Sequence, residues 1–178
     1  MEGFGLKPKE LTRIALMTAV LCILAPISLP LPGSSVALTM ATFALYLMAF
    51  ILPPKQALFA VFLYLLIGAA GLPVFAGFLS GISRFVAPGG GYLMGYLFLA
   101  GISSWFVQKY NAPFLQIAGM LFGTIAMYSL GTVWLAHSTE IPFSAALLTG
   151  IPIFLPLDIL KISLSFYIGR KLKLHIKK

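Results

Sequence analysis

Six long apolar segments, separated by proline, glycine or charged residues, constrain this chain more than any other feature. Their approximate bounds are Leu11–Ala25, Val36–Leu52, Gln56–Gly71, Gly91–Val107, Phe114–Ala136 and Phe143–Ile168. Only 9% of the residues are charged, against about 25% in an ordinary soluble domain, so lipid has to be the solvent for most of the surface. A spanning helix needs about 20 residues, and short segments can gain helical flanks. We therefore predict an all-α membrane protein, one domain over residues 1–178, folded as a bundle of six transmembrane helices.

The first segment has a second interpretation, because basic residues followed by a short apolar core are also typical of a signal peptide. The residues before Pro26 are Ile23, Leu24 and Ala25, which lack the small-x-small pattern of a cleavage site. We therefore expect the segment to be retained as a helix. The single cysteine, Cys22, lies in this apolar run, so no disulfide within the chain is possible.

The basic residues are distributed unevenly along the six-segment arrangement. Both termini and the loops after the second and fourth segments fall on one side, and they carry Lys7, Lys9, Arg13, Lys55, Lys109, Arg170, Lys171, Lys173, Lys177 and Lys178. By the positive-inside rule, this side is cytoplasmic. The net charge of +8 is thus explained by membrane topology and contact with the lipid bilayer, and we expect no nucleic-acid partner.

Asp158 and Lys161 lie deep inside the last apolar segment. Asp158 precedes Ile168 by ten residues, which places it about 15 Å from the cytoplasmic end of the helix, near mid-bilayer. A charge at that depth costs about 2.5–3.5 kcal/mol. Ser165 extends the pair to an i, i+3, i+7 spacing, so one helix face is polar and should point into the bundle. Pro152 and Pro156 just before should open the backbone at the same depth.

Three interpretations of this pair stay open. In a binding site, the ammonium receives an anionic group and the carboxylate accepts hydrogen bonds from ligand donors. The pair can instead be a structural ion pair without a ligand. A proton relay needs further ionisable groups at depth, whereas His137 and Glu140 lie in a predicted loop.

The stretch from Gly71 to Gly95 is apolar but rich in glycine and proline, so it is neither a clean spanning helix nor a solvated loop. We expect it to pack against protein as a lid or re-entrant loop between the third and fourth helices. Its Arg84 can hold a ligand anion or a lipid headgroup. The residues that we expect to line a ligand cavity with the polar pair are Phe75, Gly77, Gly91, Tyr92, Tyr128 and Trp134. The alternative for the aromatic residues is anchoring at the membrane interface.

Motifs for catalysis are absent from the sequence. It contains no G-x-x-x-x-G-K-[ST], H-E-x-x-H or C-x-x-C pattern, and only four acidic residues. We therefore expect no ATPase activity, no catalytic residues, no bound metal and no cofactor, and a membrane enzyme is disfavoured. Small-residue pairs four apart indicate close helix approach, and they are Ala15/Ala19 on the first helix, Gly91/Gly95 on the fourth and Gly119/Gly123 on the fifth.

The motifs together resemble those of the BioY family, the biotin-specific substrate-binding S components of energy-coupling factor (ECF) transporters. The resemblance rests on Gly71-Leu72-Pro73-Val74-Phe75-Ala76-Gly77, on Pro88-Gly89-Gly90-Gly91-Tyr92-Leu93-Met94-Gly95-Tyr96, and on Asp158-x-x-Lys161. It covers nearly the whole chain in length, number of segments and order of motifs.

The resemblance implies a function and partners. Lys161 would receive the biotin carboxylate and Asp158 would accept from the ureido group. Ala15 and Ala19 would dock on a transmembrane coupling subunit, and two cytoplasmic ATPase subunits would supply energy for uptake across a prokaryotic cell membrane. The alternatives are an S component for another vitamin and a secondary transporter that works alone.

Overall fold

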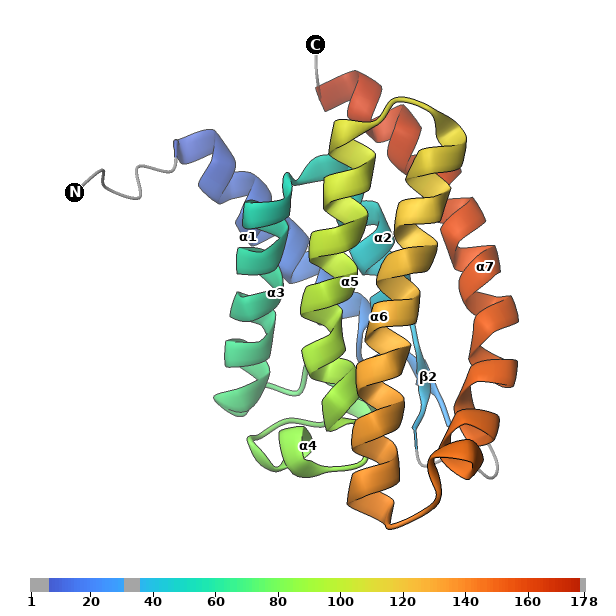
Figure 1. Ribbon diagram of the computed structural model, residues 1–178. Helices are drawn as coiled ribbons and strands as arrows, with labels where there is room; N and C mark the ends of the chain where they lie inside the picture. Colours follow the sequence, from blue (N-terminus) through green and yellow to red (C-terminus); the bar gives the residue numbers. More distant parts are fainter. Residues whose placement is uncertain (1–6, 31–35, 177–178) are drawn as a thin grey trace, which may run out of the picture.

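The computed structural model describes residues 7–30 and 36–176 of the chain and is mostly helical (Figure 1). In chain order the elements are α1 (Pro8–Leu24), β1 (Ser28–Leu29), β2 (Leu38–Thr39), α2 (Ala41–Ile51), α3 (Pro54–Ala69), the 3₁₀ turn η1 (Ala76–Phe78), α4 (Ser83–Val86), α5 (Gly90–Lys109), α6 (Pro113–Thr139) and α7 (Phe143–Ile176). Each of the six apolar segments overlaps one of the long helices α1, α2, α3, α5, α6 and α7.

The helix predicted over Val36–Leu52 is shorter than expected. Residues 36–40 are not helical, and α2 begins at Ala41. Leu38 and Thr39 form β2, which pairs antiparallel with β1 in the register Ser28 to Thr39 and Leu29 to Leu38. An extended backbone here satisfies its polar groups by pairing with the segment that leaves α1, where Pro26 and Pro30 prevent a helix. The prediction of helix at 36–40 is therefore wrong.

Length and composition identify two of the described helices as candidate membrane spans. These are α5, with 20 residues, and α6, with 27 residues. The apolar helices α2 and α3 are shorter, with 11 and 16 residues. The crossing of a membrane by all six long helices stays a prediction.

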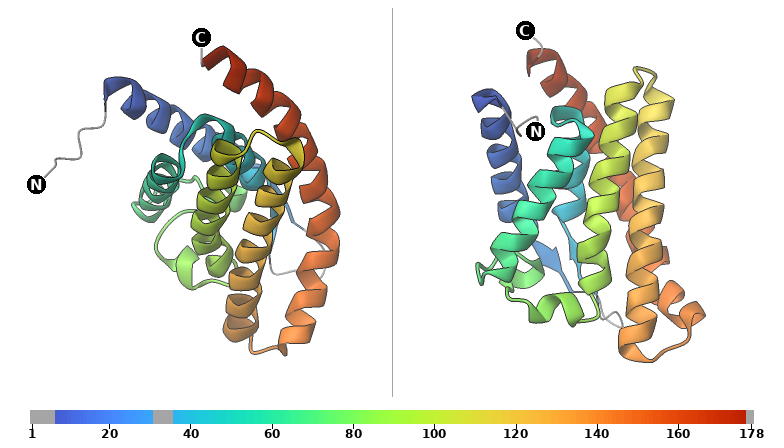
Figure 2. Two further views of the ribbon diagram at one scale, coloured as in Figure 1. Left: turned by 45° about the horizontal axis from the view of Figure 1, so that its top comes forward. Right: turned by 60° about the vertical axis from the view of Figure 1, so that its left-hand side comes forward.

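The antiparallel helices α5 and α6 form the centre of the bundle, with α1 and α3 on one side and α7 on the other (Figures 1 and 2). Glycines allow α5 and α6 to approach closely: a Cβ at Gly95 would collide with Met127, and one at Gly123 would collide with Leu99 and Ser103. This confirms the close approach predicted from the small-residue spacing. The start of α1 and the end of α7 lie at one end of the bundle, and α4 lies near the other (Figure 1).

Helix α7 continues through both of its prolines. Pro152 and Pro156 lie inside the helix over Phe143–Ile176 and do not divide it in two, so the predicted opening of the backbone is absent. Neither proline can donate a backbone hydrogen bond, and two carbonyls of the preceding turn therefore lose their usual donor. The helix bows around the bundle (Figure 2, left), and its middle faces α2 and α6.

Candidate functional site

Asp158 and Lys161 form a buried ion pair in the middle of α7. The Lys161 ammonium lies 3.1 Å from Oδ1 of Asp158. The two residues are only 2% and 9% exposed. Their spacing of three residues puts them on the same helix face, as the sequence predicts. Ser165 is also buried on this helix, but its hydroxyl donates to the carbonyl of Ile162 and takes no part in the ion pair.

Three helices hold the Asp158 carboxylate. Oδ1 accepts hydrogen bonds from Lys161 and from the Thr42 hydroxyl of α2, which lies 2.8 Å away. Oδ2 accepts from the Tyr128 hydroxyl of α6 at 2.5 Å. Both oxygens of the carboxylate therefore accept hydrogen bonds from the protein, although the residue lies deep inside it.

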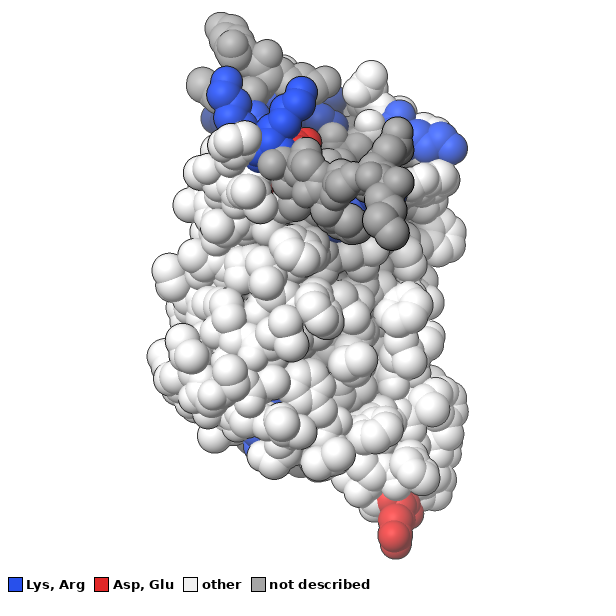
Figure 3. Space-filling view, turned by 90° about the vertical axis from the view of Figure 1, so that its left-hand side faces the viewer, with Lys and Arg blue, Asp and Glu red and all other residues white. Residues whose placement is uncertain are grey.

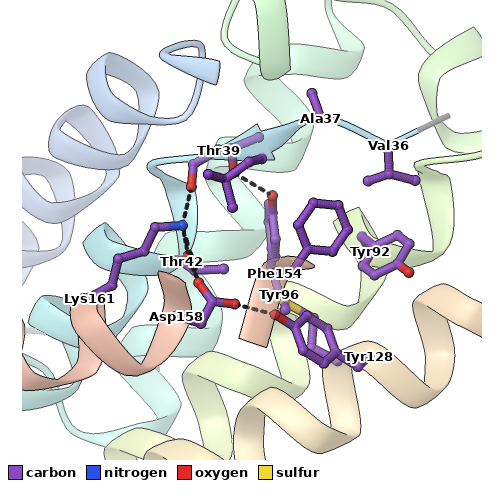
Figure 4. A pocket seen from close by; sticks show the side chains of 12 residues that line it. Val36, Ala37, Thr39, Thr42, Tyr92, Tyr96, Tyr128, Phe154, Asp158 and Lys161 are labelled. Atoms are coloured by element: carbon purple, nitrogen blue, oxygen red, sulfur yellow. Dashed lines mark hydrogen bonds and ion pairs between the residues drawn. The ribbon is translucent and has the colours of Figure 1, made fainter. Parts of the chain in front are cut away.

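Three protein acceptors surround the Lys161 ammonium, which matches the number of its protons. They are Oδ1 of Asp158, the Thr42 hydroxyl at 3.0 Å and the Thr39 carbonyl at 2.7 Å. The last of these belongs to β2, so the extended segment before α2 is tied directly to α7 (Figure 4). A ligand anion could accept a hydrogen bond from Lys161 only by displacing one of these acceptors.

A small cavity of about 40 Å³ opens beside this polar cluster. Its lining combines the extended segment, α2, α5, α6 and α7, as Figure 4 shows. The lining residues are Val36, Ala37, Leu38, Thr39, Thr42, Tyr92, Tyr96, Met127, Tyr128, Phe154, Asp158 and Lys161. One wall of the cavity therefore carries charges and hydroxyls, while the others are aliphatic and aromatic.

A larger cavity of about 530 Å³ adjoins the small one. Tyr92, Tyr96 and Thr39 are among the residues that line both. The rest of its lining comes from β1 and from the glycine-rich segment between α3 and α5, including Phe75, Gly77 and Arg84. A volume of this size lies in the range of about 300–1,000 Å³ that is typical of small-molecule sites.

Arg84 lies on α4 and lines the larger cavity. Its side chain is half-buried, and it has neither a hydrogen bond nor an ion pair with any residue that the structure describes. The two adjoining cavities therefore have polar groups of different kinds: the small cavity has the ion pair of Asp158 and Lys161, and the larger one has the Arg84 guanidinium, which has no partner among the described residues.

The glycine-rich segment packs against the protein, as predicted. Phe75 is buried and makes edge-to-face contacts with Tyr64 of α3 and Phe85 of α4, at centroid distances of 5.6 and 5.7 Å. Gly77 has φ of 71°, a conformation that favours glycine. Its N–H donates to the carbonyl of Pro26 at 3.1 Å, which joins this segment to the end of α1.

Two predicted lining residues lie elsewhere. Gly91 and Trp134 line neither cavity, and they contact each other between α5 and α6, where a Cβ on Gly91 would collide with the indole side chain. The indole N–H of Trp134 donates to the carbonyl of Ala87 at 3.0 Å. Trp134 thus holds Ala87 of the glycine-rich segment, and Gly91 leaves room for the Trp134 side chain. His137 and Glu140 also line neither cavity.

Sequence reasoning missed several residues of the site, four of which are polar or aromatic. Thr39 and Thr42 supply polar groups to the ion pair, and both are polar residues within an apolar segment. Tyr96 follows Tyr92 by four residues, and Phe154 precedes Asp158 by four, so each shares a helix face with a residue already chosen. The extended backbone at Thr39 had no such signal.

Ala15 and Ala19 lie far from the cavities, on α1. Both are exposed, and neighbouring Leu11, Leu16 and Ile23 are exposed as well. This face of α1 is therefore apolar and uncovered within the chain. Exposed small residues four apart leave room for a second helix to approach.

Comparisons with known proteins identify the family of this chain. The sequence profile of the BioY family matches residues 1–178. The chain is 36% identical over 154 residues to biotin transporter BioY2 of Lactococcus lactis subsp. cremoris, an alignment that covers 85% of this chain and 83% of the relative. It is 32% identical over 165 residues to biotin transporter BioY of Thermotoga maritima, with 93% and 96% covered.

The fold also has a close structural counterpart. It matches the crystal structure of the S-component for biotin from an ECF-type ABC transporter with a TM-score of 0.87 and 28% identity, over 97% of this chain and 95% of the other. The family profile spans the full sequence, and relatives above 30% identity align over most of both chains. This protein therefore belongs to the BioY family, a family of transporters rather than enzymes.

Proposed function

We propose that this protein is a membrane-embedded biotin-binding subunit that mediates biotin uptake as the S component of an ECF-type transporter. The observation that carries the proposal is the buried pair of Asp158 and Lys161, held by Thr42 and Tyr128 at the wall of an aromatic cavity. The relatives named biotin transporters and the S-component for biotin support the choice of ligand.

Biotin matches the two kinds of lining in this cavity. Its ureido group presents two N–H donors and one carbonyl acceptor, its thioether ring is apolar, and its valerate chain ends in a carboxylate. Oδ2 of Asp158 accepts one hydrogen bond from the described residues and can accept another from a ureido N–H, while the hydroxyls of Tyr92 and Tyr96 can donate to the ureido carbonyl. Tyr92, Tyr96 and Phe154 supply the apolar surface for the rings.

The carboxylate of biotin has two candidate partners. The resemblance assigns it to Lys161, but the protons of that ammonium already point at three protein acceptors. Arg84 lines the larger cavity and has no described partner, and a guanidinium suits a carboxylate because it can bind both oxygens. In our proposal the ureido ring lies against Asp158 and Lys161, and the valerate chain extends toward Arg84.

A ligand comparison tests this orientation. Biotin and biotin methyl ester are titrated into the detergent-solubilised protein and into Arg84→Gln, Lys161→Met and the matched control Arg13→Gln, whose residue is exposed on α1. If Arg84 binds the carboxylate, Arg84→Gln lowers the affinity for biotin and leaves the affinity for the ester nearly unchanged. In that case Lys161→Met lowers the affinity for both ligands equally. If Lys161→Met instead loses binding of biotin but keeps binding of the ester, Lys161 is the partner of the carboxylate.

The proposed membrane placement follows the charges. In the face shown in Figure 3, lysine and arginine gather at the end that carries the termini, and the broad middle of the surface carries almost no charge. In our proposal this end is cytoplasmic, all six long helices cross the bilayer, and the cavities open toward the outside. Extended residues 36–40 add length to the short helix α2.

Uptake also needs an energy source. In our proposal the apolar face of α1 around Ala15 and Ala19 docks on a transmembrane coupling subunit, and two cytoplasmic ATPases act through it. Uptake of labelled biotin is measured in a biotin-requiring host without its own transporter, with and without the coupling and ATPase subunits. Uptake that requires these subunits supports an S component. Full uptake by the chain alone supports a secondary transporter. Binding of a different vitamin in preference to biotin overturns the proposal that biotin is the ligand.

A further inference from the structure

An apolar groove lies away from the biotin site, near the α2–α3 turn. It consists of two adjoining cavities of about 550 and 480 Å³, both of which are lined by Lys55 and Phe59. The full set of lining residues, which we call the α3 groove, is Ile14, Pro53, Pro54, Lys55, Gln56, Leu58, Phe59, Phe62, Leu97 and Trp105. The groove therefore combines an apolar length along α3 and α5 with one lysine at the start of α3.

The apolar part of the α3 groove follows one helix face. Leu58, Phe59 and Phe62 are exposed and succeed one another along the second and third turns of α3. Leu97 of α5 forms the opposite wall. From Lys55 to Phe62 the groove follows α3 for about 10 Å, a length along which an alkyl chain can lie parallel to the helix.

The polar end of the groove is positively charged. Lys55 is exposed, and its ammonium has no hydrogen bond or ion pair among the residues that the structure describes. The ammonium of Lys109 lies 4.3 Å from the ring centroid of Trp105, which lines the same groove. The acid in this region, Glu10, already accepts hydrogen bonds from Gln56 Nε2 and from the Lys7 backbone N–H.

An occupant has to complement both features. A positive end calls for an anion, and an apolar groove that opens toward lipid calls for an alkyl chain. We propose that the α3 groove binds an anionic phospholipid of the cytoplasmic leaflet. Its phosphate lies between Lys55 and Lys109, and an acyl chain follows α3 as far as Phe62. This proposal rests on the membrane placement given above and not on the identity of the transported ligand.

Native mass spectrometry of the detergent-purified protein tests the proposal. Phosphatidylglycerol and phosphatidylcholine with identical acyl chains are added, and the fraction of protein that retains each lipid is measured. We expect tighter retention of phosphatidylglycerol by the unmodified protein. Lys55→Gln should weaken the binding of phosphatidylglycerol about fivefold, the equivalent of roughly 1 kcal/mol for one lysine at an anionic surface. Lys9→Gln, an exposed lysine outside the groove, is the matched control and should leave retention unchanged.

A second variant tests the apolar part. Leu97→Trp places a larger side chain in the groove and should lower retention of both lipids, whereas Met94→Trp, which changes an exposed residue of α5 outside the groove, should not. Equal retention of the two lipids by the unmodified protein, an equal loss in Lys9→Gln, or full retention in Leu97→Trp each overturns the proposal. If Leu97→Trp instead prevents copurification of the coupling subunit, the groove binds protein. A failure of biotin binding would leave all these lipid measurements unaffected.

Discussion

The hydroxyl of Tyr128 donates a hydrogen bond to Oδ2 of Asp158 at 2.5 Å, so a residue of α6 holds a carboxylate of α7. The other carboxylate oxygen is held by Thr42 and Lys161. A buried carboxylate with donors on both oxygens can keep its charge without water. The site is therefore built before a ligand arrives, which reduces the cost of ordering it on binding.

Removal of this hydroxyl should weaken both folding and binding. In Tyr128→Phe, Oδ2 of Asp158 loses its described donor, and hydrogen bonds to charged groups contribute about 1.5–3 kcal/mol. We expect a lower midpoint of thermal unfolding in detergent and a weaker affinity for biotin. Tyr167→Phe is the control, because Tyr167 is 62% exposed on α7. An unchanged midpoint and affinity in Tyr128→Phe would show that the contact is dispensable.

Neutralising Asp158 and Lys161 distinguishes a ligand-binding site from an ion pair that only stabilises the fold. Asp158→Asn and Lys161→Met each leave one buried charge without its partner, which costs about 3–5 kcal/mol of unfolding free energy. The double variant leaves no orphan charge, so it should be more stable than either single variant. We expect all three to lose tight biotin binding in calorimetry. Retention of binding by the double variant would mean that the pair only supports the fold.

Gly91 should matter for packing and not for ligand contact. A Cβ at this position would collide with Trp134 and with the Leu130 carbonyl, so Gly91→Ala should lower the thermal midpoint. Gly89→Ala is the matched control, because a Cβ at Gly89 meets no heavy atom within 4 Å. In the folded fraction of Gly91→Ala, the ratio of the affinities for biotin and for biotin methyl ester should be the same as in the unmodified protein. A changed ratio would place Gly91 at the ligand.

The exposed face of α1 should be needed for transport and not for binding. Ala15→Leu and Ala19→Leu fill the space through which a coupling helix would approach. We expect normal biotin affinity in detergent and a loss of most uptake in cells that express the complete transporter. Ser129→Leu makes a similar change on an exposed position of α6 and should have no effect on uptake. Full uptake by both alanine variants would exclude this docking face.

Sequence alone located the charged centre of the site and the order of the helices. Asp158 and Lys161 stand out because an apolar segment rarely carries charges, and their spacing requires a common helix face. The glycines of α5 and α6 predicted close packing for a similarly local reason, since a missing Cβ is visible in the sequence. Such features depend on a few neighbouring residues.

Contacts between distant segments could not be predicted in the same way. Thr42 and Asp158 are 116 residues apart, and Lys161 is 122 residues from Thr39, so only the fold brings them together. Trp134 looked like a lining residue because it is aromatic, but its orientation toward Ala87 depends on how α6 packs against the glycine-rich segment. The strand pair at Thr39 depends in turn on the path of the chain after α1.

Calorimetric titration of biotin into the purified full-length protein, beside Asp158→Asn, tests the central claim most directly. The account predicts saturable binding of one biotin per protein, with tight affinity that is lost when the carboxylate becomes an amide. It also predicts a rise in the thermal midpoint of the unmodified protein with biotin concentration. The absence of both heat and stabilisation in a folded sample would contradict biotin as the ligand, and equal binding by Asp158→Asn would contradict this site.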